Sequence, residues 1–165
     1  MRNWPKARNE RKVNAIDGYN SNIIEGINEA FYRALAETRP MSQDFKGENR
    51  MASAFNVWQF IKKTIKYQKD PDSYQMIRLP GRLLQDGEGD CKSVSIMAAA
   101  ILKNLGFPVM FRYASYKSDP TPTHVYVVTF DKDNSPIIVD PVWPKFNSEA
   151  KYRHKRDVLM KVVNK

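Results

Sequence analysis

The chain has 165 residues, of which 42% are hydrophobic and 12% aromatic, and a formal net charge of +9 at pH 7. This length suits one folded domain, and the apolar content excludes a disordered chain. No run of 18 apolar residues is present and the first residues lack the apolar stretch of a secretory signal, so we expect neither a membrane span nor secretion through a signal peptide. The only cysteine, Cys91, cannot form an internal disulfide, which favours a reducing compartment.

The positive charge is concentrated at the two ends of the chain. Residues 1–12 carry five Lys or Arg against one Glu, and residues 145–165 carry seven against one Glu and one Asp. Between these ends, residues 13–144 hold 15 basic and 15 acidic side chains, which argues against a nucleic-acid-binding body. Two interpretations of the basic ends stay open: they keep the chain soluble, or they dock onto an acidic partner or nucleic acid.

Two helices are predicted before the cysteine. Residues 1–19 are expected to form an irregular basic arm, and an apolar face then recurs with helical spacing from Asn20 until Pro40 ends it. A second amphipathic helix is predicted from about residue 48 to about residue 67, with its apolar stripe in the core. Residues 70–90 show no clear period, which predicts a long loop of the kind that often carries function.

The third helix is predicted to begin at the cysteine. An apolar run from Val94 to Leu105 follows, and Gly106 ends it. Asp90 is a good N-cap, which places Cys91 in the first turn, where the positive end of the helix favours thiolate over thiol. A lone cysteine so placed is a candidate nucleophile, although a cysteine in an Ala-rich helix is also commonly a small buried apolar residue.

Three strands are predicted after this helix, at residues 109–113, 124–130 and 136–140. The turn at 131–135 joins the last two as an antiparallel hairpin. Because helices come first and strands follow, the sequence predicts an α+β fold in which the N-terminal helices and the Cys-bearing helix pack on a small antiparallel sheet.

The predicted domain covers residues 20–146. The basic segment 147–165 is then expected to be a C-terminal tail, with a short helix at about residues 157–163.

A cysteine nucleophile needs a base, and the base needs a third group that fixes its tautomer. The chain has two histidines. His154 lies in the basic tail and is expected to be solvated, whereas His124 begins a predicted strand. In a hairpin that turns near residues 131–135, Asp140 lies close to the level of residue 126 and within reach of the His124 ring.

An attacked carbonyl also needs donors for its oxyanion. The backbone N–H at the start of the Cys91 helix is one candidate, and the side chain of Gln85 is another. The spacing Gln-x5-Cys is the one that papain-like proteases use for this role, but glutamine is also common in loops. One cysteine and two distant histidines offer no paired ligand spacing, so neither a metal nor another cofactor is expected.

Taken together, these residues resemble the transglutaminase-like superfamily. The resemblance is carried by three motifs: Gly89-Asp90-Cys91 before the helix, Thr123-His124-Val125-Tyr126-Val127, and Val139-Asp140-Pro141. It covers residues 48–144. It implies a papain-like fold and a Cys-His-Asp triad, with Cys91 as nucleophile, His124 as base and Asp140 as the orienting group.

The chain departs from the family pattern in two ways. Lys92-Ser93 follow the cysteine where the family often has an acidic pair, and the extra β-domains of the animal cross-linking enzymes are missing. The spacing Gln75-x-x-Arg78-x-Pro80 resembles compact forms that bacteriophages often carry.

Two functional hypotheses follow. The first is a cysteine acyl-transfer enzyme that acts on a protein or peptide substrate, more as a protease or amidase than as a cross-linking enzyme. The second is a structural or adaptor protein of a bacteriophage virion with a dormant triad, whose basic arms at residues 1–12 and 145–165 dock on virion proteins or DNA. The expected location is the cytoplasm of a bacterial host or the virion.

Overall fold

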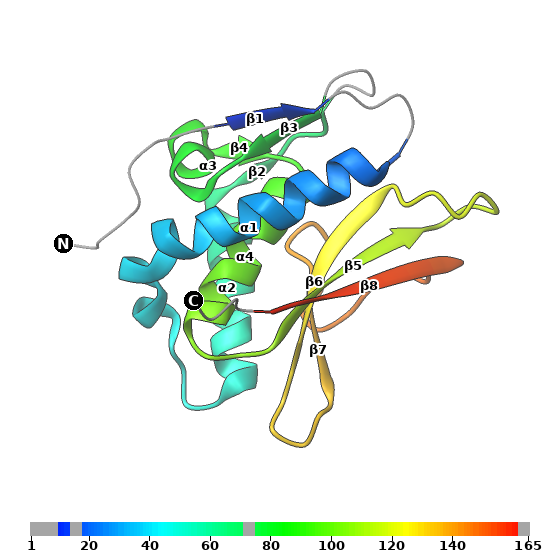
Figure 1. The fold of residues 1–165 in the computed structure, drawn as a ribbon. Coiled ribbons are helices and arrows are strands. Elements are labelled where there is room, and N and C mark those ends of the chain that lie inside the picture. The colour runs from blue at the N-terminus through cyan, green and yellow to red at the C-terminus, as the bar shows by residue number, and fades with distance from the viewer. Residues whose placement is uncertain (1–9, 14–17, 71–74, 162–165) are drawn as a thin grey trace.

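The computed structural model describes residues 10–13, 18–70 and 75–161, and its helices form one layer against a four-stranded sheet (Figure 1). The helices are α1 (Ser21–Ser42), a 3₁₀ turn (Gln43–Phe45), α2 (Arg50–Thr64), α3 (Pro80–Asp86) and α4 (Cys91–Asn104). The strands are β1 (Glu10–Val13), β2 (Lys66–Tyr67), β3 (Gln75–Arg78), β4 (Glu88–Gly89), β5 (Val109–Ser115), β6 (His124–Phe130), β7 (Pro136–Val139) and β8 (His154–Met160).

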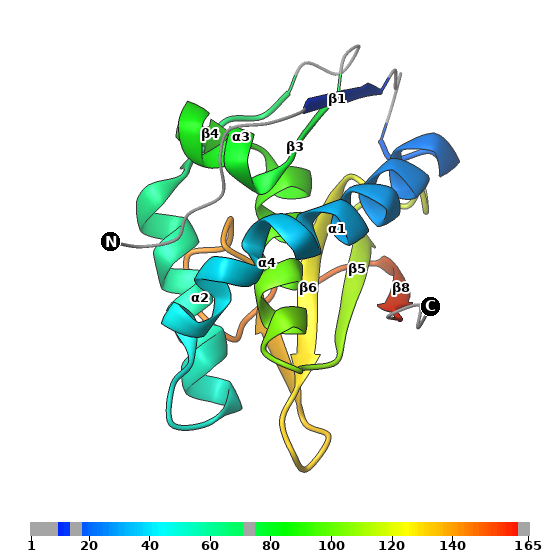
Figure 2. The same cartoon turned by 60° about the vertical axis from the view of Figure 1, so that its left-hand side comes forward.

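Helix α4 is the centre of the molecule (Figure 2). It packs against α1, α2 and α3 and against strands β5 and β6. All residues from 91 to 102 are buried, as expected for a helix that has neighbours on every side. The predicted α+β arrangement is confirmed, and the Cys-bearing helix is its most enclosed element.

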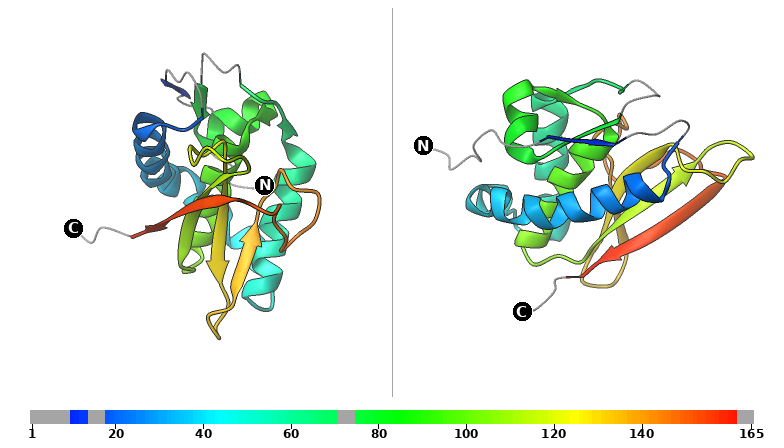
Figure 3. Two further views of the ribbon diagram at one scale, coloured as in Figure 1. Left: turned by 90° about the vertical axis from the view of Figure 1, so that its right-hand side faces the viewer. Right: turned by 45° about the horizontal axis from the view of Figure 1, so that its top comes forward.

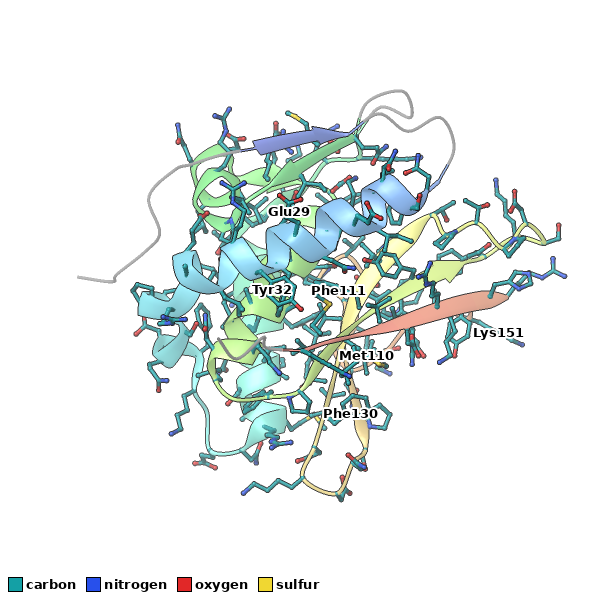
Figure 4. All side chains as sticks on the ribbon, in the orientation of Figure 1. Glu29, Tyr32, Met110, Phe111, Phe130 and Lys151 are labelled. Atoms are coloured by element: carbon teal, nitrogen blue, oxygen red, sulfur yellow. The ribbon has the colours of Figure 1, made fainter. Side chains whose placement is uncertain are left out.

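The main sheet is antiparallel throughout and has the strand order β7-β6-β5-β8. Neighbouring residues of β5 point to opposite faces, since Phe111 packs in the main core and Met110 packs with a smaller cluster on the other face (Figure 4). This alternation fixes which side of each strand faces α4.

The C-terminal segment corrects one prediction. Residues 154–160 form β8 along one edge of the sheet and not a tail with a helix at 157–163 (Figure 3). They pair with β5 from Ser115↔His154 to Val109↔Met160. Pairing with β5 therefore prevails over the helix-compatible composition of this segment, and the sheet extends beyond the predicted boundary at residue 146.

Three further boundaries differ from the predictions. Helix α1 continues through Pro40 to Ser42, because Met41 in that last turn is fully buried in the core. Residues 10–13, expected to be part of an irregular arm, form β1 and pair antiparallel with β3. The predicted loop at 70–90 contains β3, α3 and β4, which are too short to show a period in the sequence. Among the described helices, none is long and apolar enough to cross a membrane.

Candidate active site

The cysteine lies at the first residue of α4, as predicted. Asp90 is the N-cap, and its carboxylate accepts a hydrogen bond from the Lys92 backbone N–H at 3.1 Å. The chain enters this turn in close contact with α3, since a Cβ on Gly89 would lie 2.5 Å from Cδ1 of buried Leu83. Cys91 is only 4% exposed, and the backbone N–H groups of this turn have no partner within the helix.

The hairpin β6–β7 brings His124 and Asp140 together. Its register pairs Val127 with Val139, which places the two side chains at the same end of the hairpin. His124 Nε2 lies 2.8 Å from Asp140 Oδ2, while Asp140 Oδ1 accepts a hydrogen bond from Val142 N at 3.1 Å. The carboxylate is therefore held at both oxygens, and Nδ1 is the ring nitrogen left for another partner.

That partner is Cys91. Burial on its own lowers the pKa of His124, but the negative charge of Cys91 and the hydrogen bonds to Asp140 and Cys91 outweigh it and raise the pKa to about 10. Ser95 on α4 helps to set the distance between the helix and β6, because its hydroxyl donates to the Val125 carbonyl at 3.0 Å. The structure thus brings Cys91, His124 and Asp140 into one constellation in which the His124 ring holds its proton through neutral pH.

A second ionic group lies behind the cysteine. Lys92 is fully buried, and its ammonium contacts the carboxylates of Asp90 and Asp70 and the side-chain oxygen of Gln75. Burial, despite the charge of Lys92, raises the pKa of Asp90 to about 6. Asp70 also accepts a hydrogen bond from Met76 N at 2.7 Å. Lys92 therefore ties the start of α4 to the segments that precede it.

The hydroxyl of Tyr19 contacts the sulfur of Cys91. Tyr19 Oη lies 2.7 Å from Cys91 Sγ, and both groups are buried. The segment before α1 is held against the β5–β6 loop, because Tyr19 N donates to Pro122 O at 2.7 Å. Gly18 adopts φ +63°, and a Cβ there would lie 2.7 Å from the same carbonyl oxygen. Burial, followed by the charge of Cys91, raises the pKa of Tyr19 well above its ordinary value, so the phenol stays neutral.

A cavity of about 90 Å³ opens beside the sulfur. Its described lining residues are Gly18, Tyr19, Tyr67, Lys69, Asp70, Gln75, Asp90, Cys91 and Thr123. Gln85 is not among them: it lies exposed near the end of α3. The structure therefore brings together the three predicted triad residues but does not bring Gln85 to them.

The other histidine lies away from this constellation. His154 is exposed at the start of β8, and its Nε2 lies 3.1 Å from Ser118 O. Within the described part of the chain, no group of three or more His, Cys, Asp or Glu side chains is placed to hold a metal ion.

Sequence reasoning did not identify Tyr19 or the partners of Lys92. The only available signal was a lysine directly after the cysteine, and a lysine is usually exposed. The contact between Tyr19 and Cys91 joins residues 72 positions apart, so no local pattern indicates it.

A match to a known protein family identifies the family of this chain. A model of the transglutaminase-like superfamily matches residues 39–141, which is more than half of the chain. The chain belongs to the transglutaminase-like superfamily. The matched range ends just after Asp140 and contains Cys91, His124 and Asp140, the three positions expected to form a triad in this transglutaminase-like domain. No curated protein matches the chain.

Solved structures share the fold at low sequence identity. A candidate protease from Parabacteroides distasonis aligns over 82% of this chain and 29% of its own, with 11% identity and a TM-score of 0.54. EGTA-treated Legionella pneumophila LapG aligns over 88% of this chain and 82% of its own, with 18% identity and a TM-score of 0.50. A candidate cysteine protease from Cytophaga hutchinsonii aligns over 80% and 48%, with 12% identity and a TM-score of 0.44.

The likenesses to the Parabacteroides protein and to EGTA-treated LapG establish the papain-like, transglutaminase-like fold alone. The chain spans less than a third of the Parabacteroides protein and about half of the Cytophaga protein.

Proposed function

We propose that this transglutaminase-like domain is a cysteine hydrolase, a protease or amidase, with Cys91 as nucleophile, His124 as acid and base, and Asp140 as the group that orients His124. One observation carries the proposal: His124 joins the buried Asp140 carboxylate, at 2.8 Å, to the cysteine at the start of α4. The superfamily and the protease-like structural relatives support the same class of chemistry.

The reaction begins with attack of the Cys91 thiolate on the carbonyl carbon of a carboxamide. The backbone N–H of Cys91 at the start of α4 donates to the oxygen that becomes negative. His124 gives its Nδ1 proton to the departing amine, the C–N bond breaks, and a thioester remains on Sγ. Neutral His124 then takes a proton from water, whose oxygen attacks the thioester, and the C–S bond breaks to release the acid and the thiolate.

Tyr19 has to leave the sulfur before this reaction can start. A carbonyl carbon must come within about 3–3.5 Å of the attacking atom, and the Tyr19 hydroxyl already fills that position at 2.7 Å. The cavity of about 90 Å³ opens beside the same sulfur, so a substrate that approaches from the side of Tyr19 has to displace this hydroxyl.

Isotope incorporation tests the proposal. A peptide library containing Gln and Asn side chains is incubated with the protein in ¹⁸O-water, with and without a small primary amine, and analysed by mass spectrometry. We expect ¹⁸O in new C-termini or in Glu and Asp formed from the amides, and none with Cys91→Ala. Amine incorporation in place of ¹⁸O would show transfer, and a wild-type signal that survives Cys91→Ala would refute the triad.

A dormant domain is the second candidate. The observation that favours it is the capped and buried sulfur of Cys91. The chain would then serve as a structural or adaptor part of a bacteriophage particle, docked through its basic ends, residues 1–12 and 145–165. Residues 1–9 and 162–165 of these ends lie outside the described residues. Alkylation of Cys91 separates the candidates, because a dormant site predicts an inert thiol.

A further inference from the structure

Two larger cavities adjoin the one beside the sulfur. The cavity beside the sulfur is called the catalytic cavity below. The first of the two larger cavities, of about 310 Å³, shares Gly18, Lys69 and Thr123 with it. The second, of about 420 Å³, shares Tyr19 with it. Both border the loop between β5 and β6, one through Lys117 and the other through Pro120 and Pro122. The two cavities have no described lining residue in common, and each adjoins the cavity beside the sulfur separately. For brevity we call the pair the basic groove.

The charged side chains that line this groove are almost all basic. They are Lys69 and Lys117 in the first cavity and His154, Lys155 and Arg156 in the second, with Asp119 as the one carboxylate among the described lining residues. That carboxylate already accepts a hydrogen bond from Thr121 N at 2.9 Å. Lys155 is paired with Asp157 at 2.5 Å, whereas Lys117 and Arg156 are exposed.

The C-terminal strand supplies much of this charge. The pairing of His154 with Ser115 lays the basic start of β8 beside the β5–β6 loop, where His154 contacts Ser118 O. Part of the excess positive charge of the chain end is thereby brought next to the catalytic cavity, although residues 13–144 are neutral as a whole. A fixed local field of this sign attracts anionic ligands.

We propose that the basic groove binds an acidic segment of the polypeptide substrate, rich in Asp or Glu, on one side of the bond that Cys91 attacks. The inference rests on the proposed function and names its substrate class. A polypeptide is favoured over nucleic acid because the groove leads to a nucleophile for carbonyl carbons. Strong nucleic-acid binding also depends on many phosphate contacts, and the described lining of this groove holds four Lys or Arg side chains, of which Lys155 is paired with Asp157. An occupant of the second cavity touches Tyr19, the residue that caps the sulfur.

The test is fluorescence anisotropy of the full chain with fluorescein-labelled decapeptides. The acidic probe alternates Glu and Gly, and the matched neutral probe alternates Gln and Gly. We expect the acidic probe to bind more tightly and the difference to shrink between 50 and 200 mM NaCl. Lys117→Glu combined with Arg156→Glu should weaken the acidic probe about fivefold to tenfold, since each exposed ion pair contributes modestly.

The control is Lys46→Glu combined with Lys132→Glu. This pair makes the same change in net charge but lines a different cavity, together with Arg50 and Phe107. It should change the affinity for the acidic probe by less than about twofold. Equal weakening by both double variants would overturn the inference, because net charge alone would then explain binding.

Two more outcomes decide the question. A ten-nucleotide single-stranded DNA that binds more tightly than the acidic peptide and displaces it would overturn the inference in favour of nucleic acid.

The binding assay needs no turnover and is repeated with Cys91→Ala, which should bind as the wild type does. If the wild-type chain binds both peptides equally while iodoacetamide still alkylates Cys91 readily, the groove proposal is refuted and the proposed function is not. If Cys91 does not react with iodoacetamide, the proposed function is refuted.

Discussion

Two ionic groups lie near Cys91, one on the side of the helix and one on the sheet, and they differ in how many partners they use. On the helix side, buried Lys92 contacts Asp90, Asp70 and Gln75. On the sheet side, His124 contacts one carboxylate, that of Asp140, and its side chain keeps 16% of its surface exposed. The first group surrounds its cation with protein oxygens, while the second leaves one ring nitrogen for the sulfur.

The difference separates a structural role from a chemical one. Lys92 has no capacity left for a substrate, and its loss would leave two buried carboxylates without their cation. His124 can gain and lose a proton beside the nucleophile, because its Nδ1 is not used by Asp140. Substitutions on the two sides should therefore affect different measurements, which the following variants examine from the largest expected effect to the smallest.

Asp140→Asn should have the largest effect. It keeps the size of the side chain but removes its negative charge and replaces one of the two acceptor oxygens with an NH2 donor, a change that costs up to about 10⁴ in turnover in the serine-protease triad. The measurement is turnover of a peptide identified in the isotope experiment, with Asp133→Asn in the exposed hairpin turn as the charge-matched control.

The pH dependence of Asp140→Asn sharpens the same prediction. With a pKa of about 10, His124 keeps its proton through neutral pH and loses it only as the pH rises past that value. Wild-type turnover should therefore fall on an alkaline limb near pH 10. Removing the hydrogen bond and charge of Asp140 moves this limb to lower pH, and an unchanged limb would show that Asp140 does not act on His124.

Lys92→Met should have the largest effect on stability. Breaking a buried ion pair by removing one partner costs about 3–5 kcal/mol, since Asp90 and Asp70 would be left buried and unpaired. Urea unfolding measures the loss. Lys63→Met on the exposed face of α2 is the control and should stay within about 0.5 kcal/mol of wild type.

A double variant makes the Lys92 prediction specific. Adding Asp70→Asn to Lys92→Met removes one unpaired charge and should restore part of the lost stability. If Lys92→Met unfolds in the same urea concentration as wild type, the buried cation is not structural and the contrast with His124 fails.

Tyr19→Ala should have a smaller effect, which is on the access of small reagents to the Cys91 sulfur. Iodoacetamide should alkylate Cys91 about tenfold faster, because a hydrogen bond of order 1.4 kcal/mol no longer has to break. Phe31→Ala removes a buried aromatic ring from α1 and controls for general loosening of the core. Slower alkylation in Tyr19→Ala would show that the hydroxyl assists the sulfur and does not block it.

Gln85→Ala should have the smallest effect. Its side chain is exposed on α3 and lies outside the described lining of the catalytic cavity, so turnover should change by less than about twofold. A loss of about 10²–10³ in turnover would identify it as an oxyanion donor after all.

The sheet side of the site could be predicted from the sequence, whereas much of the helix side could not. Strand periodicity and the turn at 131–135 fix the register of the β6–β7 hairpin, and that register places His124 beside Asp140. Asp90 and the apolar run likewise place Cys91 at the start of α4. These features depend on local chemistry, which a single sequence displays.

The remaining features depend on distant contacts. Tyr19 contacts Cys91, which lies 72 positions later in the sequence, and Lys92 contacts Asp70, which lies 22 positions earlier. Strand β8 is mostly exposed and carries residues that also suit a helix, so only its pairing with β5 reveals it as a strand. Between residues 75 and 89, helix α3 has seven residues, which is less than two full turns, and β4 has two, so neither repeats an apolar face in the sequence.

The most direct test of the Cys91–His124 pair is the rate of alkylation by iodoacetamide between pH 5 and 10. We expect the wild-type rate between pH 6 and 8 to be higher than that of His124→Ala and to depend less steeply on pH, because a protonated His124 beside the sulfur favours the reactive thiolate. His154→Ala, the other histidine of the chain, should behave as wild type. Identical profiles for wild type and His124→Ala would contradict the account.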